Sequence, residues 1–222
     1  MEWAVKILKT EPVTHDVKRF VVERPPGYSF LPGQATMVSL DRPGWKDETR
    51  PFTFTSLNED RSLEFTIKSY EEHDGVTRAL HKLKPGDGIM IRETFGTISY
   101  RGPGVFIAGG AGITPFIAIL RRLKKDGRIE GNRLIFSNKT AKDIILENEL
   151  KEMLGSNLVL TLTRESREGY ENRRVDRAFL QEKVKDFHQH FYVCGPQAFV
   201  EGVSDALEEL GAKPDSIVFE GG

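Results

Sequence analysis

The sequence predicts two domains, an antiparallel six-stranded β-barrel followed by an α/β domain built on a parallel sheet. The first hundred residues hold about six short apolar segments separated by turn residues, a spacing typical of closed antiparallel barrels. From Val105 onward, apolar strands alternate with amphipathic helices, which is the pattern of a parallel sheet with helices on both faces. We expect the domains to span residues 1–100 and 101–222, joined by the linker Tyr100 to Gly104.

The barrel is predicted from short segments with the periodicity of β-strands. Leu63, Phe65 and Ile67 alternate with polar residues, so one face of this strand is apolar. Proline and glycine pairs, such as Pro25-Pro26-Gly27, supply the turns. The expected elements are an opening strand around Ala4 to Leu8, strands at Val17–Val22, Ala35–Leu40, Leu63–Lys68 and Ile89–Ile91, a further segment at Arg50–Ser56, and a short helix at Gly75–Leu83.

The α/β domain starts with the most informative stretch of the chain, Val105 to Pro115. Four apolar residues predict a strand buried on both faces, and three glycines in the next four positions allow a turn too tight for a side chain. Thr114 is the expected N-cap of the following helix, Pro115 its first residue and Gly127 its end. Turn and helix would together point backbone N–H groups at one anionic ligand.

The remaining α/β elements place further loops beside this turn. Ligands of a parallel sheet bind beyond the carboxyl ends of the strands, where the strand order reverses, so the candidate loops are 109–114, 137–139, 163–174 and 194–196. The expected strands are Leu134–Phe136, Leu158–Leu162, Phe191–Cys194 and Ser216–Phe219, and the expected helices run from about Ile145 to Met153, from Asp176 to Val184 and from Phe199 to Leu210.

The glycine turn does not identify its ligand by itself. Pro115 stands where the dinucleotide fingerprint has its third glycine. The second strand ends in Ser137-Asn138-Lys139 and lacks the acidic residue that would hold a ribose. From these residues alone, an ordinary tight strand-to-helix turn stays open as an alternative.

Composition excludes several classes of function. A net charge of −1 gives no basic field for nucleic acid or an anionic membrane. No apolar run is long enough to span a membrane and no signal peptide is recognisable, so a cytoplasmic protein is expected. The single cysteine, Cys194, excludes an internal disulfide, a four-cysteine iron–sulfur cluster and a thiolate zinc site within this chain. Redox chemistry would therefore need an organic cofactor or a partner. The only close pair of histidines in the sequence is His188 and His190, and no metal site is expected there.

Five motifs follow one another in the order found in one enzyme family. They are Leu31-Pro-Gly-Gln34, Arg50-Pro-Phe-Thr-Phe-Thr-Ser56, Gly75-Val-Thr77 with Lys84-Pro-Gly-Asp87, Gly109 to Pro115, and Cys194-Gly-Pro196. With them the chain resembles, over essentially its whole length, the ferredoxin-NADP reductase family, in which a flavin-binding barrel is joined to a pyridine-nucleotide domain. The resemblance implies an NAD(P)H-dependent flavoprotein reductase.

The resemblance implies a flavin site on the barrel. Arg50 is suited to the flavin phosphates, Phe52 to the isoalloxazine face, and Thr53, a catalytic residue in this reading, to a hydrogen bond with flavin N5. The residues alone leave a surface ion pair for Arg50 and barrel core for Phe52 and Phe54 as alternatives. The expected flavin-binding residues are Arg50, Pro51, Phe52, Thr53, Ile67, Lys68, Gly75, Val76 and Thr77.

The resemblance also implies a pyridine-nucleotide site on the second domain. Its expected residues are Gly110, Gly112 and Thr114 at the pyrophosphate, Cys194, Gly195 and Pro196 at the nicotinamide, and Arg164 at the adenosine end. Cys194 would act by steric placement, since nothing in the sequence activates it as a nucleophile. Arg164 favours NADPH through its 2′-phosphate, whereas a solvated loop of mixed charge, and NADH, stay open.

Two departures from the family pattern affect these expectations. Phe52 stands where many members have tyrosine, which removes a hydroxyl from the flavin site. The C-terminus, Phe219-Glu220-Gly221-Gly222, lacks the terminal aromatic residue that covers the flavin in many relatives. Either Phe219 or Glu220 approaches the ring, or that side of it is open.

The expected function is hydride transfer from NADPH or NADH to bound FAD, with FMN open, followed by electron transfer to a flavodoxin or ferredoxin. No intrinsic iron–sulfur cluster, nucleic acid or membrane partner is expected. Two alternatives stay open: reduction of free flavin or a quinone by the same fold, and a non-catalytic regulatory module that binds nucleotide.

Overall fold

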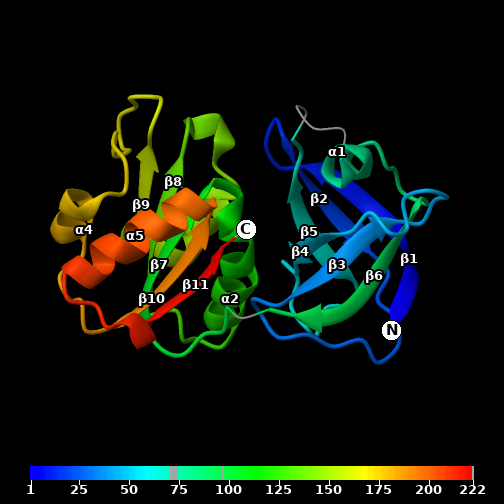
Figure 1. Ribbon diagram of the computed structural model, residues 1–222, viewed down its shortest axis with the longest axis horizontal. Coiled ribbons are helices and arrows are strands. Elements are labelled where there is room, and N and C mark those ends of the chain that lie inside the picture. Colours follow the sequence, from blue (N-terminus) through cyan, green and yellow to red (C-terminus); the bar gives the residue numbers. More distant parts are fainter. Residues whose placement is uncertain (71–74, 97, 222) are drawn as a thin grey trace.

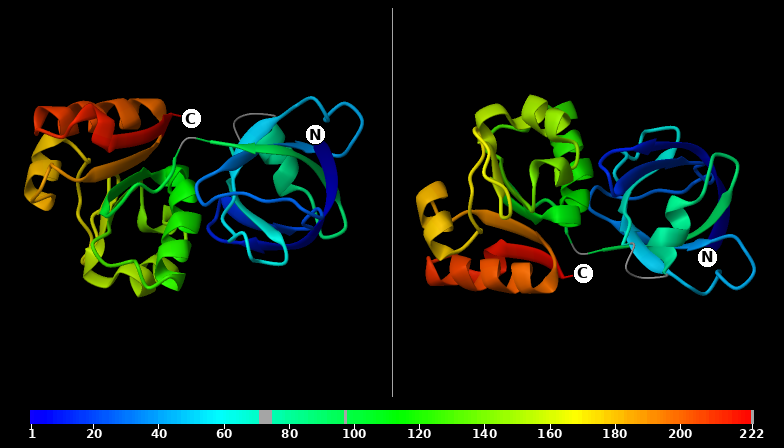
Figure 2. Two further views of the ribbon diagram at one scale, coloured as in Figure 1. Left: turned by 90° about the horizontal axis from the view of Figure 1, so that it is seen from below. Right: turned by 90° about the horizontal axis from the view of Figure 1, so that it is seen from above.

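A computed structural model describes residues 1–70, 75–96 and 98–221. Its two domains lie side by side (Figures 1 and 2). In the N-terminal domain a six-stranded sheet has the order β4-β3-β6-β1-β2-β5, and every neighbouring pair runs antiparallel. The strands are β1 (Glu2–Pro12), β2 (Val17–Val22), β3 (Ala35–Leu40), β4 (Arg50–Thr53), β5 (Leu63–Lys68) and β6 (Gly88–Phe95), with helix α1 (Val76–His81) between β5 and β6.

The predicted barrel is confirmed by the way this sheet closes. An isolated antiparallel bridge between Phe54 and Phe65 joins the end of β4 to β5, the two outer strands of the sheet order. Both rings are fully buried, and Phe54 stacks on Phe30 with ring centroids 4.2 Å apart. The alternation of apolar residues in β5 therefore points into the barrel core, because every second side chain faces the same side.

The C-terminal domain contains the predicted parallel sheet. Its strand order is β11-β10-β7-β8-β9, with helices between the strands (Figure 1). The strands are β7 (Gly104–Gly109), β8 (Arg133–Asn138), β9 (Leu158–Leu162), β10 (His190–Gly195) and β11 (Ile217–Gly221); the α-helices are α2 (Thr114–Lys125), α3 (Glu147–Leu154), α4 (Arg177–Lys183) and α5 (Gln197–Glu209); the 3₁₀ turns are η1 (Gly110–Ile113), η2 (Ala141–Asp143), η3 (Gly155–Asn157) and η4 (Pro214–Ser216).

Two apolar clusters cover the two faces of this sheet. One contains Phe106 and Phe136 of the sheet with residues of α2 and α3, and the other contains Ile107 and Ile135 with residues of α4 and α5. Successive strand residues alternate between the clusters, which explains why these strands read as unbroken apolar runs. Val17 and Ile98 of the N-terminal half join the α2 cluster, so the two domains share apolar contact.

Helices α2 and α3 start differently from the predictions. Thr114 is not the N-cap, because η1 brings the chain into helical dihedrals one turn earlier and Ile113 takes the cap position; the Thr114 hydroxyl instead donates to Ala111 O at 3.0 Å. Helix α3 begins at Glu147, later than expected. A capping box of Thr140 and Asp143 first begins the separate turn η2, and Leu146 then adopts a left-handed φ of 54°, which interrupts the helical path.

The linker between the domains is fixed by one buried side chain of β10. The Tyr192 hydroxyl accepts hydrogen bonds from the backbone N–H groups of Arg101 (2.9 Å) and Gly102 (3.0 Å) and donates to Gly102 O (2.8 Å). Its ring stacks on Phe106 with centroids 4.5 Å apart. All the hydrogen-bonding capacity of this hydroxyl is therefore used within the protein.

We expect Tyr192→Phe to lower the free energy of unfolding by about 2 kcal/mol, because two backbone donors and one acceptor lose their partner. Urea denaturation would measure the change. Tyr170→Phe is the control, since the Tyr170 hydroxyl contacts a carboxylate, that of Glu147, rather than the linker. Equal and small effects of the two substitutions would contradict the role given to Tyr192.

Candidate functional site

The strand order of the C-terminal sheet reverses between β7 and β10. From β7 the chain passes to β8 on one side, whereas β10 and β11 lie on the other. The loops that leave the carboxyl ends of β7 and β10 therefore meet at one crevice, as the fold rule for open parallel sheets requires. These are two of the four loops predicted to bind a ligand.

Three glycines let the backbones at this crevice approach closely. A Cβ atom on Gly112 would lie 2.5 Å from the carbonyl carbon of Cys194 and 2.6 Å from the Cα atom of Gly195. A Cβ atom on Gly195 would lie 2.8 Å from the Phe199 ring and 3.3 Å from the Cα atom of Gly109. The structure thus brings the predicted residues Gly112, Cys194 and Gly195 together, with no space for a side chain at Gly112.

The turn at the crevice ends in the N-terminus of α2. Gly110 opens η1 with a φ of +54°, which glycine adopts without strain. η1 leads directly into α2, so the positive dipole end of this helical segment lies at the turn. The Thr114 N–H already donates to Ala111 O and Pro115 has no N–H, so the backbone donors nearest to the turn are those of η1. Backbone N–H groups and a positive dipole end favour an anionic group such as a pyrophosphate over an apolar one.

Polar residues of the loops after β8 and β9 lie at the same edge of the sheet, on the side away from β10. The N–H groups of Thr163 and Arg164 donate to the carbonyls of Asn138 and Lys139, each at 2.9 Å, so the loops after β8 and β9 run together. Asn138 is 5% exposed, and neither atom of its side-chain amide has a hydrogen-bond partner within the described part of the chain. A buried amide in this state fits a polar ligand, because leaving it unpaired costs about 1–3 kcal/mol.

The arginines after β9 divide into two groups. Arg173 pairs with Glu182 and lies over the Phe179 ring at 4.8 Å, and Arg167 lies over the Tyr170 ring at 5.4 Å. Arg164 is exposed and makes no ion pair with any residue that the structure describes. Arg174 is likewise exposed and in no ion pair among the described residues, so Arg164, Arg174 and Lys139 are the cations of these loops that are left for an anionic ligand.

The predicted flavin residues of β4 lie along the edge of the barrel. Arg50 and Pro51 are exposed, and Phe52 and Thr53 are half-buried. The Arg50 guanidinium donates to the carbonyl of Thr49 at 2.7 Å, and within residues 1–70, 75–96 and 98–221 it pairs with no carboxylate. The ion-pair alternative for Arg50 therefore finds no support.

The other predicted flavin residues come from β5 and α1. Gly75 precedes α1, in which Val76 is buried and Thr77 half-buried, and His81 of the same helix lies with its Nε2 atom 2.7 Å from the carbonyl of Ile67. This contact joins the end of β5 to α1. Both elements flank the same end of the barrel (Figure 1).

Lys68 contacts a carboxylate rather than standing alone. Its ammonium lies 2.8 Å from Asp16 Oδ2. Burial raises the pKa of Asp16, but hydrogen bonds from Lys68 and Thr14 outweigh it, so the pKa of Asp16 lies below its usual value. A role of Lys68 at a phosphate would require this pair to open or to share the cation.

Among the residues that the structure describes, one cluster of potential metal ligands is present, although the sequence predicts no metal site. His15 Nε2 lies 3.7 Å from carboxylate oxygens of both Asp16 and Asp143. Lys68 and Thr14 already hydrogen-bond the Asp16 carboxylate, and Thr140 bonds that of Asp143. Both carboxylates are therefore already bonded by protein groups, and the cluster is a polar contact between the two domains.

The C-terminal strand runs beside the crevice. β11 pairs in parallel with β10, which places Phe219 beside Val193, and the Phe219 side chain is exposed. That Phe219 approaches the flavin ring therefore stays a prediction. The Glu220 side chain and Gly222, which belong to the same expectation, lie outside the described residues.

Sequence reasoning missed a charged link between the domains, formed by Arg121 of α2, Glu64 of β5 and Glu149 of α3. One signal was available. Residues 115–120 of α2 are apolar without interruption, and all of them are buried. A helix with no polar face in this stretch must be covered on two sides, here by its own sheet and by the barrel.

No helix in the described part of the chain has the length and apolar character that crossing a membrane requires.

Comparison with protein families assigns both domains. Residues 4–100 match the oxidoreductase FAD-binding domain, and residues 106–205 match the oxidoreductase NAD-binding domain. Among solved structures, the chain superposes with a TM-score of 0.86 on a ferredoxin NADP⁺ reductase from Neisseria gonorrhoeae with bound FAD and NADP, at 22% identity and over 100% of this chain and 98% of that one. That similarity establishes the two-domain fold.

Curated relatives are reductases of several electron-transfer systems. The chain is 23% identical to the ferredoxin–NAD(P)⁺ reductase component of the naphthalene 1,2-dioxygenase system of Pseudomonas putida, over 95% of this chain and 66% of that protein. It is 29% identical to NADH-cytochrome b5 reductase 2 of Danio rerio, over 98% of this chain and 84% of that protein. The chain spans 62% of the propane 2-monooxygenase reductase component of Rhodococcus jostii, so some relatives contain a further part.

Proposed function

We propose the function of this chain from its family, since it belongs to the ferredoxin-NADP reductase family. It is an NAD(P)H-dependent flavoprotein reductase that passes electrons from bound FAD to a separate acceptor. Residues 1–100 would form the flavin domain and residues 101–222 the nucleotide domain. A flavodoxin or ferredoxin is the acceptor we favour, since it accepts single electrons. When bound, the flavin supplies the conversion of a hydride into one-electron steps.

The observation that carries this proposal is the junction of η1 with the end of β10. Gly112 lies against the backbone of Cys194 and Gly195, and the N-terminus of α2 opens at the same place. A pyrophosphate held there would leave the nicotinamide beside Cys194, Gly195 and Pro196. The same helix, α2, packs against the barrel that carries Arg50 and Thr53.

Each group of residues has a distinct task in this proposal. The Arg50 guanidinium would bind flavin phosphate, and Phe52 would pack against the ring. Thr53 would donate a hydrogen bond to the ring nitrogen that receives hydride. Cys194 would orient the nicotinamide by contact, so the chain contributes mainly proximity and orientation to the reaction.

The visible absorbance spectrum of the purified protein tests the proposal. We expect a flavin spectrum that bleaches when NADPH or NADH is added without oxygen. Protein that is colourless but active when flavin is added would favour the free-flavin or quinone reductase. Protein that neither takes up FAD or FMN nor oxidises either nucleotide would be a binding module, and the reductase proposal would be wrong.

The loops after β8 and β9 favour NADPH as the donor, because Arg164 and Lys139 are cations without a carboxylate partner in the described residues. We expect Arg164→Ala to raise the Michaelis constant for NADPH about 10-fold or more, because one charge-assisted hydrogen bond is lost. The Michaelis constant for NADH should change less than about 2-fold. Steady-state kinetics with both nucleotides measure this. Arg167→Ala is the control. Equal changes for the two nucleotides would contradict a 2′-phosphate contact.

A further inference from the structure

Helix α2 contacts both domains along its length. Its N-terminus carries the turn at the nucleotide crevice, and its middle packs on the barrel: Ile119 Cδ1 would lie 3.2 Å from a Cβ atom on Gly33. Phe116 and Leu120 belong to the same apolar cluster as Val17 and Ile98 of the N-terminal half. α2 is thus a rigid connection between the two candidate sites.

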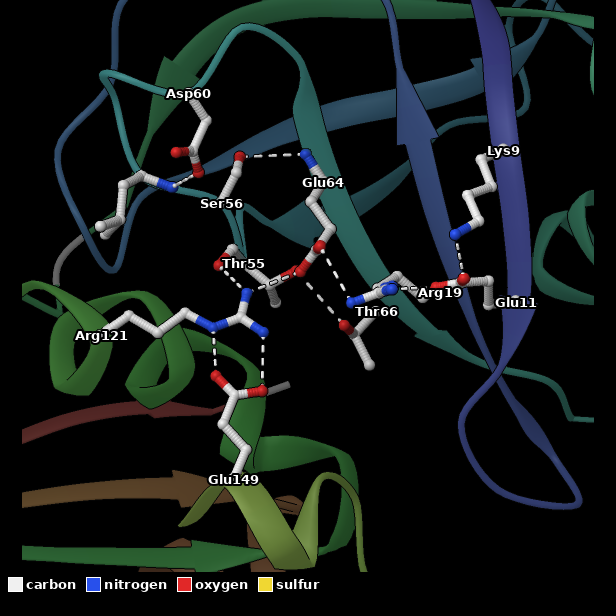
Figure 3. A network of polar contacts seen from close by, with 11 residues as sticks. Lys9, Glu11, Arg19, Thr55, Ser56, Asp60, Glu64, Thr66, Arg121 and Glu149 are labelled. Atoms are coloured by element: carbon white, nitrogen blue, oxygen red, sulfur yellow. Dashed lines mark hydrogen bonds and ion pairs between the residues drawn. The ribbon is translucent and has the colours of Figure 1, made fainter. Parts of the chain in front are cut away.

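Arg121 bonds this helix to both sides at once (Figure 3). Its Nη1 atom donates to Glu64 Oε1 of the barrel and to the carbonyl of Thr55, both at 2.7 Å. Its Nε and Nη2 atoms donate to the two carboxylate oxygens of Glu149 at 2.5 and 2.9 Å. The Arg121 guanidinium therefore bonds its own domain through Nε and Nη2 and the barrel through Nη1.

The surroundings of Arg121 make this link costly to break. The Arg121 side chain is 19% exposed and that of Glu64 14%, so water screens the pair little. Glu64 also accepts from the Thr55 hydroxyl at 2.8 Å and lies 3.6 Å from Arg19 Nη1, and Arg19 pairs with Glu11. Burial lowers the pKa of Arg121, but the hydrogen bonds and charges of Glu149 and Glu64 raise it by more. The pKa of Arg121 therefore lies above its usual value, and the guanidinium stays charged.

We propose that Arg121 is a positioning residue that fixes α2, and with it the nucleotide turn, against the flavin-binding segment of the barrel. Thr55, whose carbonyl it holds, follows Thr53 by two residues, and Thr114 lies about 10 Å away along the helix axis. A rotation of α2 about this point moves the turn relative to β4. The inference rests on the proposed function, because its consequence is the distance over which hydride is transferred.

The test compares Arg121→Met, Arg121→Lys and Glu64→Gln with Arg177→Met. Arg177 is the matched control, because it pairs at 3.3 Å with Glu209 inside the C-terminal domain. Rapid mixing with saturating NADPH would measure the limiting rate of flavin bleaching, with and without deuterium at the transferred position. Spectral titration gives the nucleotide dissociation constant, thermal unfolding the stability, and small-angle X-ray scattering the shape of the protein.

We expect Arg121→Met to lower the limiting rate about 10- to 100-fold and to enlarge the isotope effect, because the domains separate without this link and even a displacement of about 1 Å costs on the order of 100-fold. The dissociation constant should change less than about 3-fold, because the crevice itself is intact. Lysine should restore part of the rate, because it keeps the charge but not the bidentate geometry. Glu64→Gln should follow Arg121→Met in direction, and scattering should show a less compact pair of domains.

Other outcomes would overturn the inference. A limiting rate within about 2-fold of the wild type in Glu64→Gln and Arg121→Lys would remove the positioning role, even where Arg121→Met fails to fold. So would an unchanged scattering profile in Arg121→Met, or an equal loss of rate in Arg177→Met. A wild-type flavin that no nucleotide bleaches would contradict the proposed function instead, and the scattering comparison would still decide whether Arg121 fixes the domains.

Discussion

Arg50→Ala should purify with little or no flavin. Its affinity for FAD should be at least about 100-fold weaker than that of the wild type. The guanidinium is exposed at the start of β4, and its one hydrogen bond goes to the neighbouring carbonyl of Thr49. Such a side chain adds little to folding, but a bidentate grip on a phosphate chain supplies several charge-assisted hydrogen bonds of about 1.5–3 kcal/mol each. The ratio of visible to ultraviolet absorbance and a titration with FAD measure the loss.

Stability separates this binding effect from unfolding. We expect the free energy of unfolding of the apoprotein to change by less than about 0.5 kcal/mol, as for other exposed positions. Arg42→Ala is the matched control, because Arg42 lies in the same loop region and pairs with Asp87 at 3.1 Å. Full flavin content in Arg50→Ala, or equal loss in Arg42→Ala, would mean that the phosphates bind elsewhere.

Local patterning accounts for the parts of the fold that the sequence predicts well. Val17–Val22, Ala35–Leu40, Leu63–Lys68 and Leu158–Leu162 are strands with the predicted bounds. Each is a short apolar or alternating run bounded by turn residues, so its pattern is complete within six residues or so. The fold class follows from the order of such segments, because parallel and antiparallel sheets need different connections.

Contacts between distant residues account for what the sequence does not predict. Arg121 and Glu149 are separated along the chain by 28 residues and Arg121 and Glu64 by 57, and each is unremarkable among many charged residues. The residue type of Thr114 predicts a helix cap, yet the preceding 3₁₀ turn decides where the helix starts. Likewise, only the fold shows that Lys68 pairs with Asp16.

Gly112 illustrates the reverse case, a residue whose type is informative before its contacts are known. Three glycines after a buried strand predict a close backbone approach, and the fold supplies the approaching partner, the end of β10. Gly112→Ala should therefore abolish nucleotide binding at concentrations where the wild type is saturated, a loss of about 100-fold or more. The new Cβ atom would lie 2.5 Å from the Cys194 carbonyl carbon, a backbone atom that has no rotamer to escape into.

The crevice must widen to admit that methyl group, and the widening separates the N-terminus of α2 from the residues that would hold the nicotinamide. Flavin content should remain, since the barrel is not involved, and stability should fall by about 1–3 kcal/mol. Gly202→Ala in α5 is the control: a Cβ atom there meets nothing within 4 Å, so the helix should be unchanged or stabilised by up to about 1 kcal/mol. Spectral titration of both variants with NADPH distinguishes the two effects. If Gly112→Ala bound nucleotide as the wild type does, the pyrophosphate would not lie at η1, and the donor site would have to be sought at another edge of the sheet.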